Sequence, residues 1–153
     1  MALTWKIVID CADPHALADF WAAALDYTVE DPGALVTELR ESGRIPASEV
    51  TTHLGSERFA RFAAIRHPDD PFTEFTGIGA GRRILFQQVP EPKQVKNRLH
   101  LDLHDDGGDV EALVTRLEAF GARRIEFVDE GPAGSWWVMA DPEGNEFCAA
   151  AVG

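Results

Sequence analysis

Hydrophobic and polar positions alternate most regularly over residues 98–104, which read RLHLDLH. The three leucines of this stretch would face one side of a strand, and its two histidines and its aspartate would face the other. The pattern therefore predicts a strand over residues 98–104 with a polar face.

Two segments place apolar residues at helical spacing. In the first, Leu17, Phe20, Trp21 and their neighbours form one apolar face after Asp13-Pro14, which supplies an N-cap and a proline at the first helical position. The second covers residues 110–120 and ends at a glycine, which is typical of a helix C-terminus. Both segments are predicted to be amphipathic helices.

Runs of β-branched, aromatic and aliphatic residues predict further strands, at residues 4–11, 27–30, 58–67, 82–89, 123–128, 136–140 and 146–150. The last two flank Asp141-Pro142-Glu143-Gly144, which has the composition of a tight turn. Trp136 and Trp137 would lie on opposite faces of their strand. The order strand, helix, three strands then occurs twice, and RRILFQQV in the first half corresponds to GNEFCAAA in the second. The sequence thus predicts a weak internal repeat.

The repeat sets the expected organisation of the chain. Residues 1–153 are interpreted as a single domain, with a first module at about 1–90, a proline-containing linker at 90–97 and a second module at about 98–153. The first module is enlarged over residues 31–81, where short helices are expected at 34–42 and 46–54 and a loop or small helix at 72–81. This enlarged segment would serve as a lid over a binding site, as a solvated connection or as a dimer contact.

Composition narrows the functional classes. The chain has 153 residues, 45% of them hydrophobic, and a formal net charge of −12. An acidic chain argues against nucleic-acid binding, which needs a basic face. No apolar run approaches the roughly 20 residues of a membrane span, and the N-terminus does not read as a secretory signal. Two cysteines, Cys11 and Cys148, are too few for a disulfide framework, so a cytoplasmic protein with reduced thiols is expected.

The repeated βαβββ unit and the motif DPEGNEF at residues 141–147 resemble the vicinal oxygen chelate superfamily of glyoxalase I, extradiol dioxygenases and bleomycin-resistance proteins. The segments Asp13-Pro14…Phe20-Trp21, LFQQVPEPK and NRLHLDL are similar to those of glyoxalase-like domain proteins. The resemblance implies an α+β fold in which two βαβββ modules form a curved mixed sheet around a cavity, with the helices outside. It also implies a homodimer.

The resemblance further implies positions for a divalent ion. Metal-dependent members bind it through an inward His or Glu near the start of each module and an inward Glu on each last strand. In the second module, His100 matches the first of these positions, but Cys148 occupies the place of the closing glutamate. In the first module, Gln87 lies on the last strand and is a weak, neutral ligand.

The remaining position, at the start of the first module, falls at Trp5 or Ile7, which share a face with Ile9. None of these three residues can bind a metal. Glu146 and Asp102 lie two residues from Cys148 and His100, and each would join a metal site only through local distortion. The metal candidates are therefore His100 and Glu146, in a site that looks incomplete.

Several roles stay open for the individual residues. His100 is either a ligand or acid–base group or a hydrogen-bonded polar residue, and Gln87 either contacts a ligand or satisfies a neighbouring strand. Cys148 is either a soft ligand or nucleophile or a small residue that fills the sheet.

Three functional hypotheses follow. In the first, the protein binds a small organic molecule without a full catalytic metal site, in a cavity lined by Trp5, Ile7, Ile9, Gln87, His100, Asp102 and Cys148. In the second, it is a divalent-metal-dependent lyase, isomerase or dioxygenase acting on a small oxygen-rich substrate. In the third, it is an assembly module whose function lies in its dimer surface.

Overall fold

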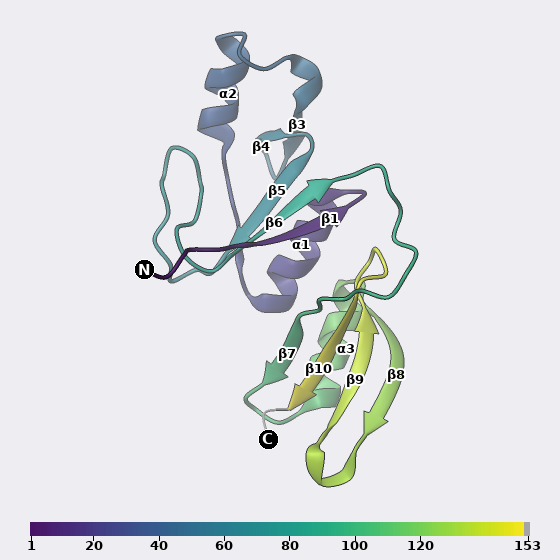
Figure 1. Ribbon diagram of the computed structural model, residues 1–153. Helices are drawn as coiled ribbons and strands as arrows, with labels where there is room; N and C mark the ends of the chain where they lie inside the picture. Colours follow the sequence, from purple (N-terminus) through teal and green to yellow (C-terminus); the bar gives the residue numbers. More distant parts are fainter. Residues whose placement is uncertain (152–153) are drawn as a thin grey trace. The chain divides into compact units, whose positions relative to one another are not determined.

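Two units divide the chain, Met1–Pro92 and Lys93–Gly153, and the computed structural model describes residues 1–151. Each unit contains a four-stranded mixed sheet with a helix packed on one face (Figure 1). The predicted α+β class, built from two βαβββ modules, is confirmed.

The first unit has the strand order β1-β6-β5-β2, in which β1 and β6 are parallel and the other neighbours antiparallel. Its repeat elements are β1 (Ile7–Cys11), α1 (Pro14–Leu25), β2 (Thr28–Val29), β5 (Phe62–Arg66) and β6 (Arg83–Gln88). Between β2 and β5 the chain adds α2 (Gly33–Glu41), a short 3₁₀ turn (Ala47–Glu49) and a separate hairpin of β3 (Val50–His53) and β4 (Ser56–Phe59).

The second unit repeats this topology without the added elements. Its strand order is β7-β10-β9-β8, with β7 and β10 parallel. The elements are β7 (Asp102–Asp105), α3 (Val110–Phe120), β8 (Arg123–Asp129), a 3₁₀ turn (Gly131–Ala133), β9 (Ser135–Ala140) and β10 (Glu146–Ala151). The identical strand order in the two units confirms the internal repeat that the sequence predicted.

Helices α1 and α3 begin and end where the sequence predicted. Asp13 accepts hydrogen bonds from the backbone N–H groups of His15 and Ala16, both at 3.1 Å, and so caps α1. Asp109 caps α3 in the same way, through the N–H of Ala112 at 2.9 Å. Gly121 ends α3 with a φ of 114°, a left-handed conformation that glycine adopts without strain.

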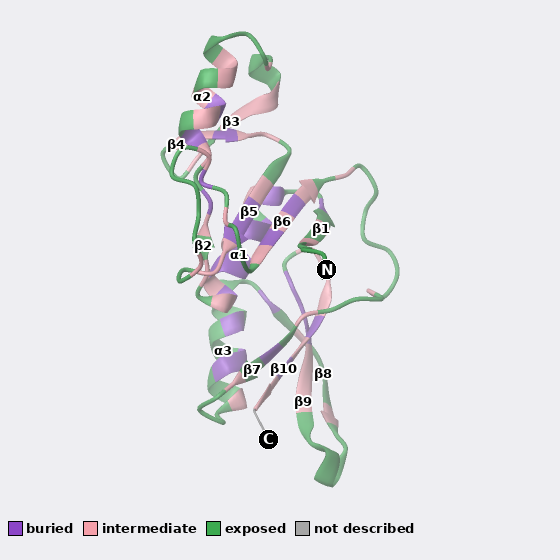
Figure 2. Cartoon of the chain, turned by 60° about the vertical axis from the view of Figure 1, so that its left-hand side comes forward, coloured by how far each residue is buried: buried purple, intermediate pink, exposed green. Residues whose placement is uncertain are grey.

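Each sheet buries one face and leaves the other open. In the first unit the buried face centres on Phe86 and Ile65, and in the second on Phe147 and Met139; all four are almost completely buried. Figure 2 shows the buried positions of the first unit along α1, β5 and β6. The two phenylalanines therefore hold equivalent places in their modules.

The structure corrects two element predictions in the enlarged segment. Within residues 46–54 the helix is limited to the 3₁₀ turn at Ala47–Glu49, because Val50–His53 pairs with β4 through a turn at Leu54 and Gly55, both of which have positive φ. The strand expected over 58–67 is two strands, β4 and β5, separated at residues 60–61. Pairing partners distant from these residues override the local pattern.

The strand predicted over residues 98–104 begins only at Asp102. Its partner β10 pairs with β7 from Cys148 onward, so the residues before Asp102 have no neighbouring strand. Leu99 accordingly lies on the surface although the alternation predicted a buried position.

Among the described residues, no helix is long and apolar enough to cross a membrane.

Candidate functional site

The open face of the second sheet carries three of the residues that the sequence indicated. Cys148 pairs with Asp102 on β7 and with Val138 on β9, and residues paired across a ladder share a face. The flanking residue Phe147 points to the opposite face, where it is buried. Asp102 and Cys148 therefore lie together on the face that α3 does not cover.

His100 joins this pair from the segment that precedes β7. Its Nδ1 atom lies 2.7 Å from Oδ1 of Asp102, and the backbone N–H of Cys148 donates to the same oxygen at 3.3 Å. An imidazole nitrogen, a carboxylate oxygen and the Cys148 Sγ atom all lie within 4.8 Å of one another. The side chains of His100 and Asp102 are 38% and 42% exposed, so a ligand has access to the group.

The surroundings of Cys148 keep its thiol protonated. Burial, and next the negative charge and hydrogen bond of Asp102, raise the pKa of Cys148 to about 11, whereas the charge of Lys96 lowers it. At neutral pH the group is a neutral thiol and not a thiolate nucleophile.

Glu146 lies on the same face, but its carboxylate binds Asn97 and Lys93 instead of the His100 group. Its carboxylate accepts a hydrogen bond from the Asn97 backbone N–H at 2.9 Å and lies 3.1 Å from Nζ of Lys93. Partial burial pushes the pKa of Glu146 upward, but these hydrogen bonds and the lysine charge outweigh it and the pKa is lowered. The cluster around His100 contains Asp102 and Cys148 and does not include Glu146, so the structure does not assemble the expected pair of His100 and Glu146.

The first unit corrects the predicted lining of the site. Ile7 pairs with Ile84 and Ile9 pairs with Phe86, so both isoleucines point to the buried face that α1 covers. The prediction that they share a cavity face with Gln87 is wrong. Gln87 follows Phe86 directly on β6, so its side chain points to the opposite, open face. The predicted strand at 4–11 starts only at Ile7, so Trp5 precedes β1, and its side chain is 82% exposed.

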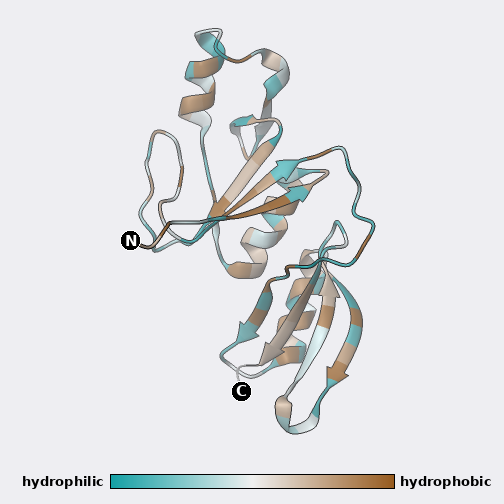
Figure 3. Ribbon diagram, in the orientation of Figure 1, coloured by the Kyte–Doolittle hydropathy of each residue, from teal (hydrophilic) through white to brown (hydrophobic). Residues whose placement is uncertain are grey.

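The residue that does share the face of Gln87 is Asp10, its partner in the ladder. When the two modules are aligned on their buried phenylalanines, Gln87 corresponds to Cys148 and Asp10 to Asp102. Figure 3 shows β1 and β6 hydrophobic over most of their length and hydrophilic toward their arrowheads. Asp10 and Gln87 each stand one residue before the end of their strand. By the same alignment, the counterpart of His100 is Val8.

Asp10 was not among the residues that the sequence indicated. The alternation of residues in β1 contained a signal for it. Ile7 and Ile9 alternate with Val8 and Asp10, and the two isoleucines are better suited to the core than an aspartate. Assigning the isoleucines to the buried face would have placed Asp10 on the open face.

The two tryptophans of β9 point to opposite faces, as predicted. Trp136 pairs with Ala150 and Val128 on the open face. Trp137 lies on the helix side, where its Nε1 donates to Glu111 of α3 at 2.7 Å. Trp136 therefore supplies an aromatic surface on the same face as Cys148.

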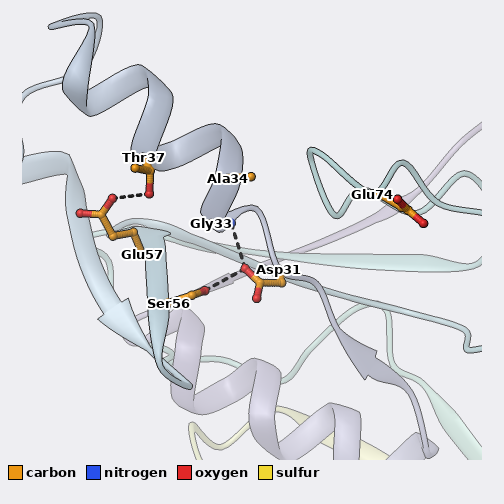
Figure 4. Close-up of a pocket in the computed structure, with 7 residues that line it drawn as sticks. All are labelled: Asp31, Gly33, Ala34, Thr37, Ser56, Glu57 and Glu74. Atoms are coloured by element: carbon orange, nitrogen blue, oxygen red, sulfur yellow. Dashed lines mark hydrogen bonds between the residues drawn. The ribbon is translucent and has the colours of Figure 1, made fainter.

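A separate pocket of about 470 Å³ lies in the enlarged segment of the first unit, outside the residues that the sequence indicated. It is lined by Asp31, Gly33, Ala34, Thr37, Ser56, Glu57 and Glu74. Figure 4 shows Asp31 accepting hydrogen bonds from the Gly33 N–H and from Ser56, and Glu74 standing apart on another loop. Burial raises the pKa of Asp31, but these bonds and the Arg58 guanidinium outweigh it, and the pKa is lowered. The pocket wall is therefore acidic and hydrogen-bonded.

Several solved structures are similar to this chain over nearly its whole length. A glyoxalase/bleomycin resistance protein/dioxygenase family enzyme from Burkholderia phytofirmans PsJN has a TM-score of 0.56 and 19% identity, and the match covers 96% of each chain. The fosfomycin resistance protein of Mesorhizobium loti has a TM-score of 0.59 and 11% identity, over 98% of this chain and 91% of that one. A mutant of the Listeria monocytogenes fosfomycin resistance protein, in complex with Mn(II) and 1S,2S-dihydroxypropylphosphonic acid, has a TM-score of 0.60 and 13% identity, over 100% and 94%. The TM-scores and the nearly complete coverage show that this chain shares their fold.

The sequence itself gives the narrower assignment. Residues 6–150 match the model of the glyoxalase-like domain, and the chain belongs to that family. No curated protein matches it.

Proposed function

We propose that this glyoxalase-like protein binds a small organic molecule on the open sheet face around Asp102 and Cys148, without a full catalytic metal site. The observation that carries the proposal is the recurrence of one polar pair, Asp102 with Cys148 and Asp10 with Gln87, at the same ladder position of both modules. Both pairs lie on faces that the packed helices leave open.

The chemistry of the second face suggests what it recognises. Trp136, Val138 and Ala150 give it an aromatic and apolar surface, beside which lie the carboxylate of Asp102 and the imidazole of His100. Ligand sites combine apolar walls with a few placed polar groups in this way. A small molecule with an unsaturated ring and a hydrogen-bond donor fits this description.

Binding can be tested by NMR. A fragment library would be screened against the ¹⁵N-labelled full chain, and we expect hits to shift the amide signals of β9 and β10 around Val138 and Cys148. The variants Asp102→Ala and Trp136→Ala should weaken these hits at least several-fold, whereas Asp106→Ala in the exposed turn after β7 should not. A library that leaves these signals unmoved, or equal shifts in all variants, would contradict the proposal.

A second candidate function, a metal-dependent lyase, isomerase or dioxygenase, is favoured by the cluster of His100, Asp102 and Cys148. Imidazole, carboxylate and thiolate together suit a borderline ion such as Zn²⁺ better than a hard ion such as Mg²⁺. Against it, Cys148 would have to lose a proton held with a pKa of about 11, and Asp102 would have to give up its hydrogen bond to His100. The donor types fit a zinc ion, and a bound ion would act there as a Lewis acid.

Metal analysis separates the two candidates. Untagged protein would be dialysed against zinc and then buffer, and its metal content measured by inductively coupled plasma mass spectrometry for the wild type, His100→Ala and His104→Ala. His104 lies on the same face but pairs with Ala150, outside the cluster, and serves as the matched control. The metal-free proposal expects no retained zinc. Stoichiometric zinc that only His100→Ala abolishes would replace it with the second candidate.

The proposal includes a cytoplasmic, homodimeric protein. Two observations support the dimer: the resemblance to the superfamily and the large apolar side chains, such as Val8 and Phe62, that stay on the surface of the first unit.

A further inference from the structure

A group of four residues joins the added segment of the first unit to α1, and we call it the histidine latch: His15, Asp19, His53 and Phe59. His15 and Asp19 are one turn apart and share a face of the helix. Nε2 of His15 donates to the carbonyl oxygen of Phe59 at 3.0 Å, and Nε2 of His53 lies 3.0 Å from the carboxylate of Asp19. The two imidazole rings are 4.9 Å apart. The latch thus joins α1 to both strands of the β3–β4 hairpin.

The segment held by the latch is a small assembly of its own. Its hairpin is a two-stranded sheet separate from the main sheet, and such hairpins are only marginally stable alone. Helix α2 packs on it through Val36, which is fully buried, and through Glu57, which accepts hydrogen bonds from Thr37 at 2.6 Å and Arg40 at 2.7 Å. The position of this assembly therefore depends on the contacts that join it to the rest of the unit.

The charges around His15 disfavour its protonated form. Burial lowers the pKa of His15 below its usual value of 6.5, and the positive charges of His53 and Arg58 lower it further. The Phe59 carbonyl and the Asp13 carboxylate act in the opposite direction but do not outweigh these effects. His15 is consequently neutral in the packed state near neutral pH, with its single proton on Nε2.

We propose that the histidine latch is a pH-sensitive device: when His15 takes up a proton, the β3–β4 hairpin and α2 are released from α1. A protonated His15 would face the guanidinium of Arg58 and the imidazole of His53, whose positive charges both disfavour a proton on His15. The sign follows from linkage, since the packed state binds the proton less well than the released state. Packing is therefore complete above the ordinary histidine pKa and weakens as the pH falls below it.

Release would also alter the pocket of the first unit. All its lining residues except Asp31 and Glu74 belong to α2 or β4, and Gly77, in the loop that carries Glu74, packs against the Asp31 backbone. This proposal does not depend on the ligand-binding function inferred for the open sheet faces.

Hydrogen–deuterium exchange of the full chain tests the latch. Exchange corrected for intrinsic rates would be followed by mass spectrometry at about pH 7.5 and about pH 5, on either side of the ordinary histidine pKa. We expect peptides covering residues 44–60 to exchange severalfold faster at the lower pH, while peptides from β9 and β10 stay unchanged. Equal protection of residues 44–60 at the two pH values would overturn the proposal.

Variants assign the effect to the latch. His15→Gln keeps an N–H donor without a titrating charge and should abolish the pH dependence. If His15→Gln misfolds, His53→Gln tests the same coupling, because removing that charge should shift release to lower pH. His67→Gln is the matched control: this histidine belongs to the same unit but contacts Tyr27. Retention of the full effect in His15→Gln or in His53→Gln, or its loss in His67→Gln, would show that the latch does not control release.

Discussion

Cys148 shows how neighbouring residues set the chemistry of a side chain. In the sequence, the resemblance implies that Cys148 stands in place of a glutamate, and the residue type alone allows a ligand, a nucleophile or a small residue that fills the sheet. The structure adds Asp102 and partial burial, which together raise the pKa of the thiol to about 11. The residue is thereby poorly reactive near neutral pH.

This gives a prediction for Asp102→Asn. Removing the carboxylate charge should lower the pKa of Cys148 and speed its alkylation by iodoacetamide severalfold at about pH 8, because the thiolate is the reacting species. Rates would be followed by mass spectrometry of the modified peptide, with Cys148→Ser to assign the signal. Asp106→Asn removes the same charge in the exposed turn and should leave the rate unchanged. Equal rates in the wild type and Asp102→Asn would show that Asp102 does not hold the pKa up.

Glu30 and Arg83 form a second residue-scale feature, a buried ion pair at the base of the 67–81 loop. Two hydrogen bonds of 2.7 Å join them, their side chains are 5% and 12% exposed, and Glu30 also accepts the Gly79 N–H at 2.8 Å. The pair fixes the loop to β2 and β6. Removing one partner would leave a buried charge without its counter-ion.

We therefore expect Glu30→Gln to reduce the free energy of unfolding by about 3 kcal/mol, as measured by urea denaturation at pH 7. Asp70→Asn is the control, because it breaks a more exposed pair with Arg82 on the same loop and should cost clearly less. Equal losses in the two variants would mean that burial does not strengthen the Glu30–Arg83 interaction.

At the scale of elements, the sequence predicted helices α1 and α3 correctly but did not predict the β3–β4 hairpin of the enlarged segment. Helices α1 and α3 combine a capping aspartate, an apolar face and a left-handed C-terminal residue, so local signals agree with the tertiary environment. In the enlarged segment the hairpin β3–β4 depends on a partner strand and on contacts with α1 and α2, which no local pattern specifies.

The cap of α3 can be tested directly. Asp109→Ala removes the acceptor for the Ala112 N–H and should cost about 1 kcal/mol of stability, measured as a lower midpoint in urea denaturation. Asp106→Ala, in the same loop but outside the cap, should change the midpoint far less. If the two variants lost the same stability, the aspartate would not be acting as a cap.

At the scale of the whole molecule, each unit leaves one sheet face uncovered by its own helix. Sheets with one apolar or partly apolar open face are stable when another layer packs on them. The proposed dimer would provide such cover for the large apolar side chains that remain exposed on the first unit.

We accordingly expect sedimentation equilibrium to give twice the mass of 16.8 kDa, and the melting temperature to rise with protein concentration, since dissociation is coupled to unfolding in such dimers. Phe62→Glu on the open face of the first sheet should shift the equilibrium toward monomer, whereas Arg61→Glu in the preceding turn should shift it less. A mass of 16.8 kDa at all concentrations would refute the dimer.

The sequence by itself determined the repeat, the order of helices and strands along each module, and the two capped helices. It also indicated the family, because the turn and the start of the strand at residues 141–147 form a motif that a short stretch of sequence specifies. Cys148, Asp102 and His100 were among seven candidates that the sequence indicated, and the structure brings the side chains of these three together.

Only the tertiary structure decided which way each strand faces. A strand that is shifted by one residue exchanges its two faces, and the pairing of Ile9 with Phe86 removed both isoleucines from the site and brought in Asp10. Likewise, only the tertiary structure shows that Glu146 forms an ion pair with Lys93 and that the rings of His15 and His53 are in contact. These contacts join residues that are 38 or more positions apart, and they arise from packing that no local pattern of residues specifies.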